Sequence, residues 1–182
     1  MPAREAMPET PAARYHDFGL LVTLAGPMAE QCLWDGIDSM KRLALHEAAH
    51  SVAAWRLGRV IAAVVIRSDG TGQTTLVPRG VETSDAPNGR RELSDGRMAV
   101  AIAWTLRADR KAARELLRVR RHEARLHAHA DGDFIQAVAD RLLDVGSLTG
   151  LEVEHVIHET LRARWARKLE PKKKENERNV FE

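Results

Sequence analysis

Five consecutive residues of this chain have the types and the spacing to hold a metal ion and to act beside it. His46-Glu47-Ala48-Ala49-His50 spells H-E-x-x-H within Asp38–Leu57, a segment that predicts one continuous helix. Side chains at i and i+4 of a helix lie one turn apart on the same face, so His46 and His50 can bind one metal ion. Glu47 then lies near the open coordination position, which is the arrangement of a zinc hydrolase.

The helix that carries this motif has start and stop signals and is apolar on two sides. Asp38 is a preferred N-cap type, and no Gly or Pro follows before Gly58, the expected C-terminal stop. A helix with two apolar stripes is a buried helix, in which imidazoles need hydrogen bonds or a metal. The alternative to a metal site is a pair of structural histidines, hydrogen-bonded in a core. The stripes are Leu43, His46, His50, Ala53 and Leu57 on one side and Leu45, Ala48, Ala49, Val52 and Trp55 on the other.

Composition favours a single helical domain. The chain has 182 residues, of which 44% are hydrophobic and 30% charged, enough for a sizeable core. Aromatic residues make up only 4%, so the core must consist mainly of Ala, Leu, Val and Ile. A net charge of +2 does not by itself imply nucleic-acid binding. The lone Cys32 excludes a disulfide framework and a cysteine-rich zinc site, which leaves His and carboxylate as ligands and favours a reducing, cytoplasmic setting.

The elements around the motif helix predict an α+β fold that is mostly α-helical. Val60–Ile66 and Gln73–Val77 indicate a small β-hairpin or edge sheet, and the helices downstream of Ser94 indicate a bundle against the central buried helix. We expect a flexible tail over 1–14, one zinc peptidase-like domain over 15–169 and a charged tail over 170–182. No segment is long and apolar enough to cross a bilayer, and the N-terminus does not resemble a secretory signal.

The motif and its surroundings resemble the peptidase domain of the FtsH-type AAA+ zinc proteases. The similar residues are Leu45 to Trp55, Leu57-Gly58 and the strand ending in Val64-Val65-Ile66-Arg67, which follow the family's H-E-x-G-H helix and its next strand. Arg110 to Leu117 is similar to the family's G-R-A-A-E-E helix. Leu24 to Gln31 resembles that helix better, although it precedes the motif. No G-x-x-x-x-G-K-[ST] sequence is present, so we expect no nucleotide and no ATPase activity in this chain.

The resemblance also implies a third zinc ligand. Asp131 to Ala139 looks like the family's N-D-[FL]-x-x-A-T segment, whose Asp is a ligand and falls on Asp133. A carboxylate at the start of a helix is also an ordinary N-cap, which is the competing interpretation. Other candidates stay open: Asp35, Asp38, His122, His127 and His129. His155 and His158 have a metal-compatible spacing, but we expect them on an exposed face.

These observations predict a zinc-dependent metalloendopeptidase that cleaves flexible or unfolded polypeptide without its own ATPase. Zinc would supply a nucleophilic water at neutral pH, and Glu47 would accept its proton and pass it to the leaving amine. Gln73, Thr74, Thr75 and Leu76 form a short predicted edge strand to which an extended peptide could add. The alternative is a catalytically silent binding or regulatory module with a structural metal. Nucleic acid is not an expected partner, and homo-oligomer formation is left open.

Overall fold

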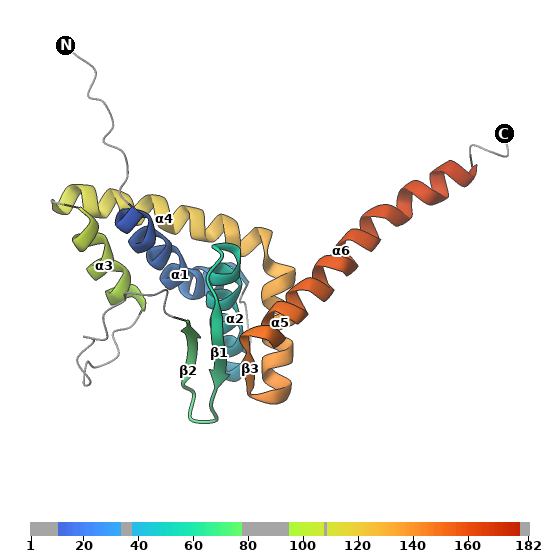
Figure 1. The fold of residues 1–182 in the computed structure, drawn as a ribbon, viewed down its shortest axis with the longest axis horizontal. Helices are drawn as coiled ribbons and strands as arrows, with labels where there is room; N and C mark the ends of the chain where they lie inside the picture. Colours follow the sequence, from blue (N-terminus) through green and yellow to red (C-terminus); the bar gives the residue numbers. More distant parts are fainter. Residues whose placement is uncertain (1–10, 34–37, 78–94, 108, 179–182) are drawn as a thin grey trace, which may run out of the picture.

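Six helices and a small antiparallel sheet make up the part of the chain that the structure describes (Figure 1). The structure is a computed structural model that describes residues 11–33, 38–77, 95–107 and 109–178. The predicted α+β, mostly helical class is confirmed. The elements are α1 (Pro11–Leu33), α2 (Ser39–Arg56), β1 (Ile61–Ile66), β2 (Gly72–Leu76), α3 (Asp95–Leu106), α4 (Arg110–Ala130), α5 (Gly132–Val145), β3 (Ser147–Thr149) and α6 (Gly150–Arg178).

Helix α2, which carries the motif, is the central helix of the fold. It packs against α1 on one side, α5 on another and the sheet on a third. Leu45, Ala48 and Val52 of one predicted stripe are buried, whereas Leu43 and Leu57 of the other are only partly buried. The helix ends where expected, because Gly58 takes a left-handed conformation with φ of 66° and donates its N–H to Trp55 O.

The sheet has the strand order β2-β1-β3, so β2 is an edge strand, as predicted. Strands β1 and β2 form the expected hairpin, in which Val64 lies opposite Thr74 and Val65 opposite Gln73. The third strand was not predicted, since β3 has only three residues and is held by its pairing with β1. Because β3 covers the other side of β1, the free edge of β2 is left beside α2.

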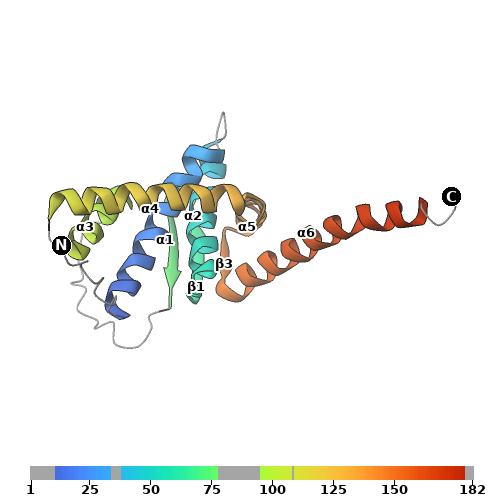
Figure 2. The same cartoon turned by 90° about the horizontal axis from the view of Figure 1, so that it is seen from above.

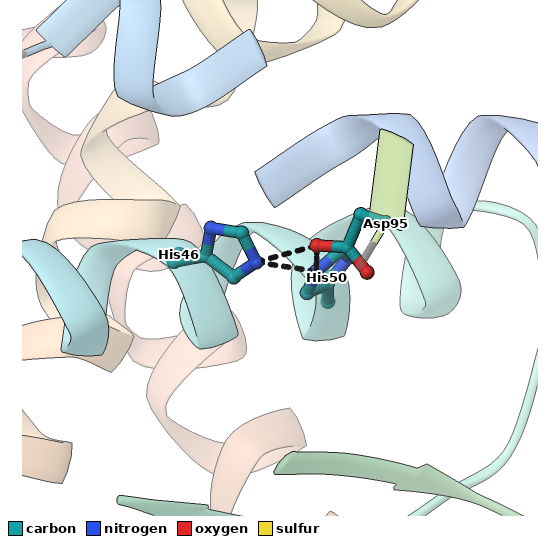
Figure 3. Close-up of side chains that lie close together, drawn as sticks. All are labelled: His46, His50 and Asp95. Carbon is teal, nitrogen blue, oxygen red and sulfur yellow. Dashed lines mark hydrogen bonds and ion pairs between the residues drawn. The ribbon is translucent and has the colours of Figure 1, made fainter. Parts of the chain in front are cut away.

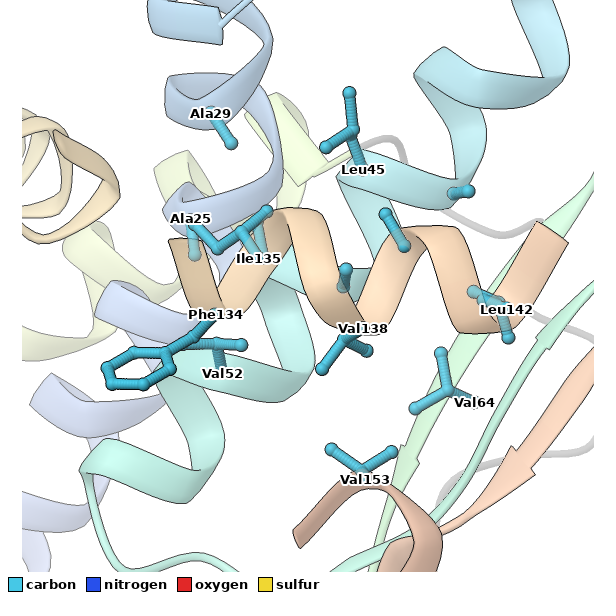
Figure 4. Close-up of a cluster of buried hydrophobic side chains, with 14 of the residues drawn as sticks. Ala25, Ala29, Leu45, Val52, Val64, Phe134, Ile135, Val138, Leu142 and Val153 are labelled. Carbon is cyan, nitrogen blue, oxygen red and sulfur yellow. The ribbon is translucent and has the colours of Figure 1, made fainter. Parts of the chain in front are cut away.

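Helix α1 joins two hydrophobic clusters in the part of the chain that the structure describes. Ala25 and Ala29 belong to the cluster around α2, α5, the sheet and the start of α6 (Figure 4). Leu20, Leu24 and Met28 belong to a second cluster with α3 and α4. In Figure 2, α4 runs along the same side of the molecule as α1 and α3, which it contacts. Two faces of α1 are therefore buried, which fixes this helix firmly beside the motif.

Several predicted boundaries differ in the structure. Helix α1 begins at Pro11, inside the predicted tail, and continues through Gly26-Pro27, although a proline inside a helix usually breaks or kinks it. The last helix extends past the predicted end at Leu169 to Arg178 and projects away from the body (Figure 1). Helix α1 continues because it is packed on two sides, with Leu24 and Ala25 in different hydrophobic clusters. The extension of α6 lies in a segment rich in Lys, Glu and Arg, which have high helix propensity. None of the helices in the ranges described above is long and apolar enough to cross a membrane.

Candidate metal centre

Three side chains from two helices converge at the H-E-x-x-H motif (Figure 3). His46 Nε2 and His50 Nε2 lie 3.0 Å apart. Asp95 Oδ2, from the first residue of α3, lies 2.7 Å from His46 Nε2 and 3.2 Å from His50 Nε2. The two histidines share one face of α2 because they are four residues apart. One point in space is therefore surrounded by two imidazole nitrogens and a carboxylate oxygen.

The other ring nitrogen of each histidine is held by α1. Glu30 Oε1 lies 2.6 Å from His46 Nδ1, and the carbonyl oxygen of Val22 lies 2.7 Å from His50 Nδ1. An acceptor at Nδ1 places the proton there and leaves the Nε2 lone pair free for a metal. Such carboxylate and carbonyl partners are the usual outer contacts of metal-binding histidines.

When no ion is bound, the surroundings of the cluster favour a protonated His46 and an ionised Asp95. Burial lowers the pKa of His46, but the hydrogen bonds to Asp95 and Glu30 and the nearby carboxylates together raise it above the usual 6.5. Burial likewise raises the pKa of Asp95, yet the hydrogen bonds and charges of His46 and His50 bring it well below 3.8. The site therefore attracts positive charge, either a proton on His46 or a cation.

This donor set fits a zinc ion. Zinc binds imidazole nitrogen and carboxylate oxygen at about 2.0–2.1 Å, so tetrahedral ligand atoms lie about 3.3–3.4 Å apart. The separations of 2.7, 3.0 and 3.2 Å would need to open by about 0.7 Å or less. Three protein ligands leave one position open, which is the composition of catalytic rather than structural zinc sites.

Glu47 lies next to the cluster but is not part of it. Its side chain is buried, with a residue exposure of 6%, and Oε2 accepts a hydrogen bond of 2.8 Å from Thr74 Oγ1. Strand β2 approaches closely there, because a Cβ on Gly72 would lie 2.7 Å from Glu47 Oε1. The carboxylate is therefore held at the boundary between the motif helix and the edge strand.

An open cleft connects the histidines, Glu47 and the edge of β2. Its walls come from α1, α2, β2 and α3, and they include Gly72, Gln73, Thr74 and Leu76. Thr75 does not line this cleft. Of the four predicted substrate-binding residues, three thus lie beside the candidate metal site.

The hydrogen-bond alternation of the sheet shows which β2 residues face the free edge. Ile66 donates its N–H to Gly146 O, away from β2, so the Ile66 and Gly72 pair is not hydrogen-bonded. Val77 donates to Val60 O, so odd-numbered residues of β2 face β1. The main-chain groups of Gly72, Thr74 and Leu76 therefore point outward, and those of Thr75 point into the sheet.

The predicted third ligand, Asp133, lies elsewhere and needs correction. It is in the first turn of α5, where Oδ1 accepts from the Phe134 N–H at 3.1 Å and lies 3.6 Å from Arg164 Nη1. Among the described residues, the group whose ligand atoms lie within 4.8 Å of one another consists of His46, His50 and Asp95. Asp133 is excluded because α5 packs against a different face of α2 from the one that carries the histidines.

Its neighbour Asp131 has a structural role. This side chain is almost completely buried. Its Oδ2 accepts a hydrogen bond of 2.5 Å from Arg56 Nε, and its Oδ1 accepts one of 2.6 Å from Arg56 Nη2. The bidentate pair ties the end of α2 to the junction of α4 and α5. The Asp-Gly-Asp segment therefore holds the fold around the site rather than the ion.

The remaining ligand candidates do not join the cluster. Asp38 is the exposed N-cap of α2, and His127 lies 3.9 Å from Glu123 on α4. His122 and His129 are exposed on α4, and His155 pairs with Glu159 on the exposed face of α6. Asp35 lies outside the described residues.

Sequence reasoning missed Asp95 and Glu30. Asp95 follows His50 by 45 residues and belongs to no spacing pattern with the motif. Its position at the start of a helix was the one sequence feature that could have indicated a ligand. Glu30 had a better signal. Val22, Gly26 and Glu30 are four residues apart, and Leu24 to Gln31 had been singled out for its resemblance to a family helix.

Comparisons with known proteins identify no relative of this chain. No protein-family model matches it, and neither the search of curated proteins nor that of solved structures finds a match. The functional argument therefore depends on the geometry of the site.

Proposed function

We propose that this chain is a zinc-dependent metalloendopeptidase in which His46, His50 and Asp95 hold the ion. The observation that carries the proposal is the convergence of the two Nε2 atoms and Asp95 Oδ2 beside the buried carboxylate of Glu47. A structural metal would have no chemical need for Glu47 next to an open cleft. The resemblance to FtsH-type peptidase domains, carried by the motif helix and the strand after it, is part of the same proposal.

Each residue has a defined task in peptide hydrolysis. An ion held by the two histidines and Asp95 would supply Lewis acidity and lower the pKa of a water molecule toward neutrality. Glu47 acts as the general base that takes the proton of the attacking water and returns it to the leaving amine. Thr74 orients the Glu47 carboxylate, while Glu30 and the Val22 carbonyl orient the imidazoles.

The substrate is an extended polypeptide that adds to the free edge of β2. Gly72, Thr74 and Leu76 present their main-chain groups outward, next to the histidines and Glu47. Main-chain pairing of this kind recognises peptides with little sequence preference. The substrate must therefore be flexible or unfolded at the cleavage site, and the chain would act without nucleotide. A reducing cytoplasmic setting belongs to the same proposal.

The test is a comparison of wild type with Glu47→Gln on an unstructured casein-like substrate. Gln is nearly isosteric with Glu but cannot accept the proton, so the variant should keep its zinc and fold while losing hydrolysis. A Glu47→Gln variant that cleaves as fast as wild type would refute the enzymatic assignment. Zinc binding without cleavage by either protein would instead identify a binding module with a structural metal.

A further inference from the structure

Helix α1 runs directly across the two metal-facing nitrogens. Three of its residues, Val22, Gly26 and Glu30, are four positions apart and therefore lie on one face. The outer two contact the Nδ1 atoms of His50 and His46. The middle residue, Gly26, lies between them and faces the Nε2 atoms. Two turns of α1, from Val22 to Glu30, thus span the two histidines, which are one turn apart on α2.

Gly26 has no room for a side chain. A Cβ built there would lie 2.6 Å from His50 Nε2, 2.7 Å from His46 Nε2 and 2.8 Å from His46 Cδ2. All three contacts are shorter than the 3.0 Å below which Cβ atoms are essentially never found. The imidazoles cannot rotate freely to relieve them, because both Nδ1 atoms are bonded to α1 itself.

The same Cβ would also lie close to an ion bound by the two Nε2 atoms. An ion bonded to both Nε2 atoms at about 2.0–2.1 Å, with the nitrogens 3.0 Å apart, lies within about 3.7 Å of that Cβ on whichever side it binds. A methyl group at this position would therefore touch the ion or one of its ligands.

We infer that Gly26 is a positioning residue of the metal centre. Its missing side chain lets α1 close over the histidines and hold both rings through Val22 and Glu30 while leaving the Nε2 atoms accessible to a metal. This role rests on the proposed zinc site but concerns a residue outside the H-E-x-x-H motif. It also gives a physical reason for a glycine inside a long helix, where Gly is otherwise unfavourable.

Zinc affinity of Gly26→Ala provides the test, with Gly19→Ala as the matched control. Gly19 lies in the same helix, and a Cβ there would have nothing within 4 Å. Both substitutions place Ala within α1, but Gly26 also precedes Pro27, whose ring disfavours a helical residue that carries a Cβ. The effect of the histidine contact is therefore isolated by the double-mutant cycle below. We expect competition with a chromophoric chelator to show zinc binding weakened at least about tenfold in Gly26→Ala and unchanged in Gly19→Ala. Equal zinc affinity in wild type and Gly26→Ala would overturn the inference and leave the proposed function standing.

A double-mutant cycle on metal-free protein separates the inference from the zinc proposal. If the new methyl clashes with the imidazoles, Gly26→Ala should destabilise wild type more than it destabilises a His46→Ala/His50→Ala background. Relief of the destabilisation in that background shows that the missing side chain of Gly26 makes room for the imidazoles, whether or not wild type binds zinc. A wild type without zinc would then contradict the proposed function and not this packing relationship. Denaturant unfolding measures how much Gly26→Ala lowers the unfolding free energy in each background. Equal destabilisation in both backgrounds would contradict the clash between the new methyl group and the imidazoles. The cycle also covers a Gly26→Ala protein that unfolds, since removal of the imidazoles should restore its folding.

Discussion

The hydroxyl oxygen of Thr74 lies 2.8 Å from Oε2 of Glu47, so the edge strand contacts the proposed general base directly. The same hydroxyl also lies 3.1 Å from the main-chain oxygen of Glu47. The strand expected to bind substrate and the helix that carries the catalytic motif therefore meet at one residue pair. Substrate pairing along β2 and the orientation of Glu47 should be linked.

Thr74→Val should separate chemistry from metal binding. Valine keeps the β-branched shape suited to a strand but removes the hydroxyl donor. We expect kcat to fall while zinc affinity stays at the wild-type value, because Thr74 contacts Glu47 and none of the three ligands. Steady-state proteolysis and a zinc titration measure the two effects. Unchanged kcat would show that Thr74 does not position Glu47.

Methylated substrates should reveal pairing with the edge of β2. In a peptide with one cleavable bond, N-methylation removes one main-chain donor at a time. Only alternate residues of an added strand face the partner edge, so methylation should raise KM at every second position. A uniform effect along the peptide, or none, would argue against strand addition. This design avoids Thr75→Pro, which would remove a donor that faces β1 and so damage the sheet itself.

As the pH is lowered, zinc affinity should begin to fall at a higher pH than it would if His46 had the usual imidazole pKa. The pKa of metal-free His46 is raised above 6.5, so as the pH falls a proton competes with zinc before the solution reaches 6.5. Glu30→Gln removes one of the carboxylates that raise this pKa, so the fall in affinity should move to lower pH. Zinc titrations between pH 5.5 and about 8 test both statements. A midpoint that moves upward in Glu30→Gln would contradict the assigned role of Glu30.

The Arg56 and Asp131 pair should respond asymmetrically to truncation. The Asp131 side chain is only 2% exposed, whereas Arg56 is 42% exposed. Arg56→Ala leaves a buried carboxylate unpaired and should cost about 3–5 kcal/mol of unfolding free energy. Asp131→Ala leaves a guanidinium that reaches water and should cost less, about 1–3 kcal/mol. Chemical denaturation of both variants measures the two losses of unfolding free energy. A larger loss in Asp131→Ala than in Arg56→Ala would contradict this prediction.

The sequence predicted the elements whose signals are local. The H-E-x-x-H helix, the β1–β2 hairpin and the edge position of β2 follow from periodicity, the Gly58 stop and turn residues within short segments.

The site residues that were missed or wrongly assigned depend on packing between segments that are far apart in the sequence. Asp95 reaches the histidines only because α3 packs on α1, and Glu30 does so because α1 lies beside α2. The Asp95 contact leaves no spacing pattern in the sequence, and the four-residue spacing of Val22, Gly26 and Glu30 does not show which helix they face. Asp133 matched a family pattern, yet the buried Arg56 and Asp131 pair holds that segment on another face of α2.

Zinc content of Asp95→Asn and Asp133→Asn, beside wild type, tests the central claim most directly. In each variant Asn preserves the size of the side chain but is neutral and a much poorer zinc ligand. Elemental analysis of proteins never exposed to chelator should find about one zinc per chain in wild type and in Asp133→Asn, and far less in Asp95→Asn. Zinc retained by Asp95→Asn and lost from Asp133→Asn, or absent from wild type, would contradict the metal centre formed by His46, His50 and Asp95.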